Sequence, residues 1–162
     1  MSDLIGRIPL PYEPLRKNRF ILRFPSDLGI QEWWVVSSSR PKYSSDEVEI
    51  PFINTSTYVI GRFRWEPISV TFRDPIGPSA TQALMEWVRL HSETVTGRQG
   101  YSLGYKRDLE LELLDPTGVT VQKWVLQGTM LTDVDFGSLD YSSSDLADIT
   151  ATLRFDRAIN VF

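Results

Sequence analysis

The stretch "DEVEIPFINTSTYVIGRFRW", residues 46–65, decides the fold of this chain. It is typical of two strands joined by the polar turn "INTST", with apolar and aromatic residues along both arms. Pro51 cannot donate a ladder hydrogen bond, so the first arm is expected at a sheet edge or outside the sheet. Because a hairpin of this length exposes apolar residues unless something covers them, it should either bury itself in its own domain or protrude and contact something outside that domain.

Period-two alternation on either side of the hairpin predicts a protein built mainly of antiparallel strands. The turn signature "DPTG" joins two of these strands as a second hairpin. Gly128, in the middle of a long strand, predicts a bulge or bend. The other expected strands are "NRFILRFP" (18–25), "EWWVVSSS" (32–39), "PISVTFRDP" (67–75), "DLELELL" (108–114), the run 119–136, and the final stretch 146–162.

A single amphipathic helix is predicted over residues 79–95. Ser79 and Gln82 match a capping box, and Gly97 offers a stop. The Gly-rich stretch that follows the helix is expected to be a loop. Together the elements predict one domain over residues 1–162, an antiparallel β-sandwich or barrel with one flanking α-helix.

Composition limits the possible functions. The chain has 162 residues and a net charge of −4. It contains no cysteine, and this absence excludes a disulfide framework, a thiolate metal site and a cysteine nucleophile. The acidic balance argues against a general nucleic-acid binder.

Residues 1–17 carry three prolines among apolar residues and predict an extended arm, either docked or frayed. They do not resemble a signal peptide, and no apolar run approaches the roughly 20 residues that span a bilayer, so no membrane anchor is expected.

A search for catalytic patterns returns none. His91 is the only histidine and lies on the apolar stripe of the predicted helix, so a structural role is favoured over a catalytic or metal-binding one. The carboxylate pairs Glu47 with Glu49 and Glu110 with Glu112 are interpreted as solvated strand faces. We therefore expect no catalytic residue, no metal and no cofactor. The five tryptophans could instead form a sugar-binding platform, which leaves a carbohydrate-binding module as an alternative from another class.

The order of these elements resembles the tail tube proteins of contractile-tailed bacteriophages. The resemblance is carried by "RPKYSSDEVEIPFINTSTYVIGRFRWEPISVTFRDPIGPSATQALMEWVRLH" (40–91) and "LELLDPTGVTVQKWVLQGTMLTDVDFGSLDYSSSDLADITATLRFDRA" (111–158). Within the first stretch, the strand after the hairpin carries the family's W-x-P-x-x-V-x-x-x-D pattern. The likeness covers most of the chain and is also shared with tube proteins of type VI secretion and extracellular contractile injection systems.

The resemblance implies a structural protein of the virion tail, assembled in the host cytoplasm. Such subunits form hexameric rings whose strands close into a continuous β-barrel, and the rings stack into a tube inside a contractile sheath. The implied partners are other copies of the chain, the sheath, the tape measure protein, genomic DNA in the lumen, and the baseplate and terminator proteins. Three alternatives remain: a baseplate tube initiator, a tail terminator, and a tube subunit of a secretion or injection system.

Three groups of residues are expected to serve the assembly. The hairpin is expected to contact the neighbouring ring through Ile53, Asn54, Thr55, Tyr58 and Ile60. The N-terminal arm is expected to contact another subunit through Ile5, Ile8 and Leu10. The lumen is expected to be lined by Glu47, Glu49, Asp148, Thr150 and Thr152.

Overall fold

The computed structural model describes residues 7–9 and 11–162, and strands dominate it. The strands are β1 (Phe20–Arg23), β2 (Val35–Ser37), β3 (Tyr43–Phe52), β4 (Thr55–Trp65), β5 (Ile68–Arg73), β6 (Arg107–Leu114), β7 (Thr120–Asp135), β8 (Asp148–Arg154) and β9 (Arg157–Asn160). The α-helices are α1 (Ala80–His91) and α2 (Ser102–Tyr105), and short 3-10 helices cover Ser26–Leu28 (η2) and Glu32–Trp34 (η3). The mainly β, antiparallel fold predicted from the sequence is confirmed.

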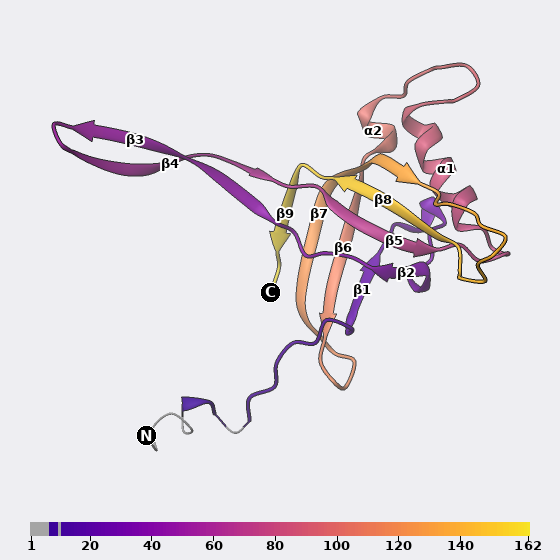
Figure 1. Cartoon of the computed structure of the whole chain (residues 1–162), viewed down its shortest axis with the longest axis horizontal. Helices are drawn as coiled ribbons and strands as arrows, with labels where there is room; N and C mark the ends of the chain where they lie inside the picture. Colours follow the sequence, from indigo (N-terminus) through magenta and orange to yellow (C-terminus); the bar gives the residue numbers. More distant parts are fainter. Residues whose placement is uncertain (1–6, 10) are drawn as a thin grey trace.

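Seven strands form one curled antiparallel sheet, a half-barrel (Figure 1). Its order is β1-β6-β7-β8-β5-β2, and β9 pairs with the first part of β7. The bend predicted at Gly128 is confirmed: its φ is +68°, and its amide donates to Asp108 Oδ1 at 3.1 Å. Because the register shifts there, β7 pairs with β9 before the bend and with β8 after it. This bend lets the sheet curl.

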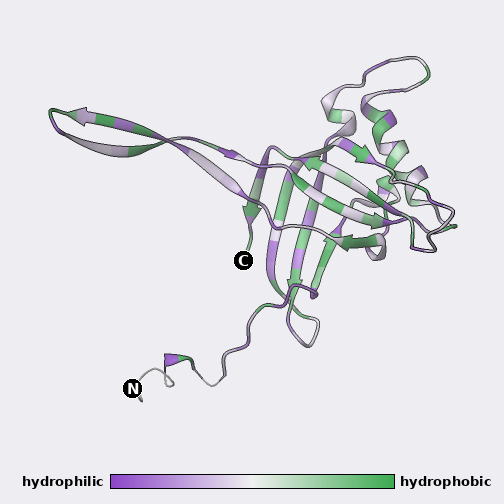
Figure 2. Ribbon diagram, in the orientation of Figure 1, coloured by the Kyte–Doolittle hydropathy of each residue, from purple (hydrophilic) through white to green (hydrophobic). Residues whose placement is uncertain are grey.

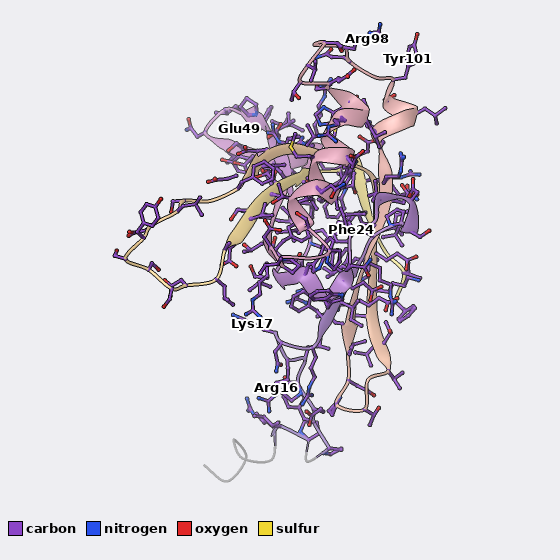
Figure 3. All side chains as sticks on the ribbon, turned by 90° about the vertical axis from the view of Figure 1, so that its right-hand side faces the viewer. Arg16, Lys17, Phe24, Glu49, Arg98 and Tyr101 are labelled. Atoms are coloured by element: carbon purple, nitrogen blue, oxygen red, sulfur yellow. The ribbon has the colours of Figure 1, made fainter. Side chains whose placement is uncertain are left out.

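The core lies on one face of the curled sheet and is completed by α1. Apolar and polar residues alternate along β5 and β8, as Figure 2 shows by colour, so one face of each strand is apolar. The fully covered residues include Ile68, Val70, Phe72, Leu84, Trp87, Leu109, Leu126, Ile149, Ala151 and Leu153. Phe24 sits inside the body (Figure 3), with its ring centroid 5.8 Å from that of Phe72 and 6.3 Å from that of Trp87. The sheet and α1 therefore share one hydrophobic core.

Helix α1 begins as predicted and ends earlier than expected. Ser79 Oγ accepts a hydrogen bond from the Gln82 amide at 3.3 Å, which confirms the N-terminal cap. The helix ends at His91, where the next residue turns to an extended conformation, four residues before the expected end at 95. The loop then folds back so closely that a Cβ on Gly100 would lie 2.1 Å from the Leu90 carbonyl oxygen. Within the stretch expected to be a loop, the single turn of α2 was not predicted.

Two strand predictions are wrong in part. "EWWVVSSS" was expected to be extended throughout, but Trp33 and Trp34 lie in η3 and the strand begins at Val35. The final stretch was expected to be one strand, but it turns at Phe155 and Asp156 into β8 and β9, which pair with different parts of β7. In both places the alternation of apolar residues continues through a local turn, so the sequence pattern does not reveal the break.

Glu112 corrects another sequence interpretation, because this carboxylate is not on a solvated strand face. It is buried, and its Oε2 accepts from Arg23 Nε at 3.0 Å and from Thr120 Oγ1 at 3.3 Å. The hydrogen bond to Glu112 raises the pKa of Arg23 above its ordinary value. Arg23 also bonds Glu32 through Nη1 at 3.1 Å, so one guanidinium joins β1, β6 and the η3 turn.

We expect Glu112→Ala to lower the free energy of unfolding by about 1–2 kcal/mol, because it removes two hydrogen bonds at a buried carboxylate. The matched control is Glu110→Ala in the same strand. The Glu110 carboxylate is more exposed and lies 3.5 Å from Lys123 Nζ, an ion pair expected to contribute about 0–1 kcal/mol. Urea unfolding of the unassembled subunit measures both values. Equal losses in the two variants would contradict the structural role of Glu112.

Candidate assembly surfaces

The described residues carry no arrangement typical of a catalytic or metal site. They contain no group of three or more His, Asp or Glu side chains placed to hold a metal ion. His91 Nδ1 lies 2.9 Å from Ser92 Oγ, its ring packs edge-on against Tyr105, and its Nε2 is buried without a hydrogen-bond partner in the described part of the chain. Neither α-helix there is long and apolar enough to cross a membrane. The surfaces that stand out are the hairpin, the polar face of the sheet and the N-terminal segment.

Strands β3 and β4 form a separate two-stranded sheet that extends away from the half-barrel (Figure 1). The turn is only Ile53 and Asn54, shorter than expected, and Ile53 adopts a left-handed φ of 53°. At ten residues, β3 is roughly 33 Å long. Pro51 faces Ser56 at this two-stranded edge, which fits its missing N–H. The predicted protruding hairpin is therefore confirmed.

Both faces of the distal hairpin expose apolar side chains. Residues opposite each other in the register point to the same side. One face carries Val48, Ile50, Phe52, Thr55, Thr57 and Val59, and the other carries Glu47, Glu49, Pro51, Ser56, Tyr58 and Ile60. A register shift near Gly61 and Arg62 then interrupts the alternation along β4, so Phe63 does not continue the face of Val59. A single subunit covers neither face.

The residues predicted to contact a neighbouring ring lie where the hairpin is most exposed. Ile53, at the tip, is 86% exposed, and Ile60 is 76% exposed. Thr55 has a local role as well, because its Oγ1 donates to the Phe52 carbonyl at 3.0 Å. Asn54 completes the turn, and Tyr58 shares a face with Ile60. Thr55 lies on the face opposite Tyr58 and Ile60, so the predicted contact residues surround the distal hairpin and do not share a single face.

The residues predicted to line the lumen do not form one surface. Glu47 lies directly opposite Ile60, and Glu49 lies opposite Tyr58, so both carboxylates belong to the hairpin face that carries the predicted ring contacts. Figure 3 labels Glu49 on the hairpin, which Figure 1 shows extending away from the body of the protein. The remaining three predicted lumen residues are on β8, in the other sheet. The structure therefore separates the predicted lumen set into two groups.

Asp148, Thr150 and Thr152 share the face of the main sheet that points away from the core. Their cross-strand neighbours make this face polar and partly acidic. Those neighbours are Ser69, Thr71 and Arg73 on β5, and Asp133 and Asp135 on β7. Asp133 and Asp135 were not predicted for this surface, although they occupy alternate positions of a predicted strand, because the face of that strand was not assigned.

The N-terminal segment runs away from the sheet without joining it (Figure 1). Of the three predicted arm contacts, Ile8 is exposed, whereas Ile5 and Leu10 lie outside the described residues. Tyr12 is exposed as well. Leu15 reaches back to a groove that it shares with side chains of β1 and β6. The described part of the arm thus leaves large apolar side chains uncovered.

The five tryptophans do not form a shared platform for a sugar. Trp34 and Trp87 are buried in the core, and Trp65 and Trp124 are partly buried against it. Trp33 is the exposed one, and its ring packs edge-on against that of Trp34. A sugar platform needs several exposed aromatic faces in one plane, and this arrangement does not provide them.

No protein-family model matches the chain. It is 24% identical over 127 residues to the "Tail tube protein" of Serratia phage KSP90, a match that covers 77% of this chain and 72% of that protein. Among solved structures, the chain is similar to the tube-terminating cap of the anti-feeding prophage, with a TM-score of 0.73, 21% identity, and coverage of 99% of this chain and 98% of that one.

The chain is also similar to a chain of the sheath–tube complex of an extracellular contractile injection system in its extended state. That match has a TM-score of 0.69, 20% identity, and coverage of 99% of this chain and 97% of that one. Both structural matches span the half-barrel and the hairpin, so they support the same fold over the whole chain. Taken with the sequence match to a phage protein, they show that the chain is similar to tail tube proteins of contractile injection systems and shares their fold.

Proposed function

We propose that the chain is the repeating subunit of a phage tail tube. Copies form hexameric rings that stack into a hollow tube inside a contractile sheath, and the tube conducts DNA into the host cell. The sequence match to a phage tail tube protein supports the phage assignment. The tube itself needs no cofactor and carries out no reaction.

The hairpin is the observation that carries this proposal. Ile53 and Ile60 are mostly exposed, and so are Phe52 and Tyr58, on a projection that the body of the subunit does not cover. Leaving this much contiguous apolar surface in water is unfavourable, and such patches mark interaction sites. A neighbouring copy in the next ring would cover both faces of the hairpin.

The polar face of the main sheet is our candidate for the lumen wall. It carries Asp133, Asp135 and Asp148, with threonines and serines between them, and its opposite face is the core. Carboxylates on this wall would repel DNA phosphates and let the genome slide, whereas basic residues would add affinity through counterion release and slow its passage. This assignment keeps Asp148, Thr150 and Thr152 in the lumen and moves Glu47 and Glu49 to the ring contact.

The proposed partners are those of a contractile tail. Other copies of this chain contact the hairpin and the exposed N-terminal segment, including Ile8. The sheath surrounds the tube, the tape measure protein and DNA occupy the lumen without sequence-specific binding, and baseplate and terminator proteins cover the ends. The protein would assemble in the host cytoplasm and remain in the tail of the virion.

A tube-terminating protein is the second candidate, because one of the similar solved structures is described as a tube-terminating cap. A terminator would have the same fold and would stop the stack after one ring. A tube subunit of an extracellular injection or type VI secretion system would polymerise like the phage subunit. Genes for virion structural proteins beside the coding sequence would favour the phage.

Electron microscopy of the purified chain tests the proposal. We expect concentrated protein to form hollow tubes of constant diameter and variable length, because the hairpin of the last ring always offers an uncovered surface to a further ring. Isolated rings that never stack would support the terminator. A compact monomer at every concentration, with the hairpin folded against its own body, would overturn both assignments.

A further inference from the structure

Two exposed surfaces lie at opposite ends of the long axis of the subunit. The hairpin extends from one end, and the loop between β7 and β8, residues 136–147, lies at the other end (Figure 1). We refer to this segment as the β7–β8 loop. One copy cannot bring the two surfaces together, because the half-barrel stands between them.

The β7–β8 loop is apolar and acidic. Its exposed large apolar residues are Phe136, Leu139, Tyr141 and Leu146, and Tyr141 is fully exposed. Asp140 and Asp145 lie between them, and the loop has no basic residue. This mixture fits a partner that is itself apolar and positively charged.

The part of the hairpin nearest the body has that composition. We define the hairpin root as residues 40–45 and 61–65. It contains Arg40, Lys42, Arg62 and Arg64 and no acidic residue.

Two aromatic side chains of the hairpin root are exposed as well, Tyr43 and Phe63. Arg64 pairs with Asp46 at 2.9 Å, whereas Lys42 and Arg62 make no ion pair within the described part of the chain. The root therefore offers uncovered rings next to two cations, Lys42 and Arg62, that form no ion pair there, with Asp46 and Glu66 at its border.

We propose that the β7–β8 loop of one copy docks on the hairpin root of the next copy. This inference rests on the proposed function, and it names a contact that the tip of the hairpin does not make. Contacts of this kind are heterologous, since two different surfaces meet, and repeating them builds an open assembly along one direction.

The charges of the two surfaces favour a loop-to-root contact over a loop-to-loop or root-to-root contact. Two β7–β8 loops would bring acidic side chains together, and two hairpin roots would bring basic side chains together; both arrangements are repulsive. A loop on a root pairs opposite charges and covers Tyr141, Leu139, Tyr43 and Phe63. The contact thus sets the polarity of the stack, whereas the apolar tip of the hairpin adds affinity.

A charge-reversal cycle tests the contact. Asp145 is the better residue for charge reversal. Asp140 Oδ1 accepts hydrogen bonds from the Ser142 amide and hydroxyl, and these bonds shape the loop. They also hold the pKa of Asp140 below its ordinary value. We expect Asp145→Lys and Arg62→Asp each to raise the critical concentration for tube assembly about tenfold, and the double variant to return it to within about threefold of the parent. A double variant no better than the worse single variant would contradict the contact.

Cysteine cross-linking gives a second, independent test, because the chain contains no cysteine. The test variant carries Ser45→Cys, opposite Phe63 in the hairpin root, and Ser144→Cys in the loop. The control carries Ser45→Cys and Ser102→Cys. Ser102 is exposed and next to Tyr101, which Figure 3 shows at the end of the α1–α2 loop, away from the hairpin residue Glu49.

Mild oxidation of assembled tubes should give the test variant a ladder of covalent oligomers on a denaturing gel and leave the control monomeric. Tubes that form without a ladder, or that give equal ladders in both variants, would overturn the loop-to-root contact and leave the tube assignment intact. Failure of the unsubstituted chain to form any tube would instead overturn the proposed function.

Discussion

Replacing Ile53, Tyr58 and Ile60 together by lysine is expected to yield a folded subunit that forms no tubes. All three side chains are exposed in the single subunit, so the substitutions leave the core unchanged and should alter its stability by about 0.5 kcal/mol or less per site. In an assembled tube, however, three added charges would be buried in the ring contact. Those at Tyr58 and Ile60 face Glu49 and Glu47 across the ladder, but the one at Ile53 faces no carboxylate, and burying charge costs several kcal/mol. Because every ring repeats the contact, assembly should be lost altogether.

The experiment compares this variant with one that changes a matched set elsewhere. Val95, Tyr101 and Leu103 are also exposed apolar residues, and they lie on the loop and helix that follow α1. Circular dichroism and thermal unfolding should be unchanged for both triple lysine variants. Negative-stain images should show tubes only for the control. Tubes of normal length from the hairpin variant would refute its role between rings.

The hairpin could be predicted from the sequence because its signals are local. Alternating residues on both arms, a polar turn, and Pro51 at an edge position all indicate a two-stranded hairpin at or beyond the sheet edge. The register shift beside Gly61 could not be predicted in the same way. It depends on how β3 and β4 pair, and it moves the residues that follow it to the other face.

The candidate site was harder to predict than the fold. Alternation assigns residues to a face within one strand, but it does not say to which sheet that strand belongs. Glu47 and Asp148 both alternate with apolar residues, yet one lies in the hairpin and the other on the main sheet. Asp133 was missed because the face of its strand was not assigned. Its neighbour across the ladder, Thr152, is 19 residues further along the chain, so no local pattern links the two.

Local turns also limit what a pattern can reveal, as the neighbouring residues Trp33 and Trp34 show. In an extended strand, consecutive side chains point to opposite faces, and apolar residues on both faces suggest that both are covered. The 3-10 helix η3 replaces that strand. It leaves Trp34 1% exposed and Trp33 65% exposed, so only one of two identical side chains contributes to the core.

We therefore expect Trp34→Ala to lower the free energy of unfolding by about 3–5 kcal/mol, the usual cost of deleting a buried large aromatic side chain. Trp33→Ala should cost about 0.5–1.5 kcal/mol, mainly through the lost edge-to-face contact between the two rings, whose centroids are 5.9 Å apart. Urea unfolding of each variant in the non-assembling Ile53, Tyr58 and Ile60 lysine background measures both values without a contribution from tube formation.

A third variant separates volume from hydrogen bonding at this position. The indole Nε1 of Trp34 is buried and has no hydrogen-bond partner among the described residues. An unsatisfied buried donor costs about 1–3 kcal/mol, so Trp34→Phe removes that penalty while it creates a small cavity. We expect Trp34→Phe to lose less than half of what Trp34→Ala loses. Similar losses in Trp33→Ala and Trp34→Ala would mean that η3 does not direct the two rings to opposite environments.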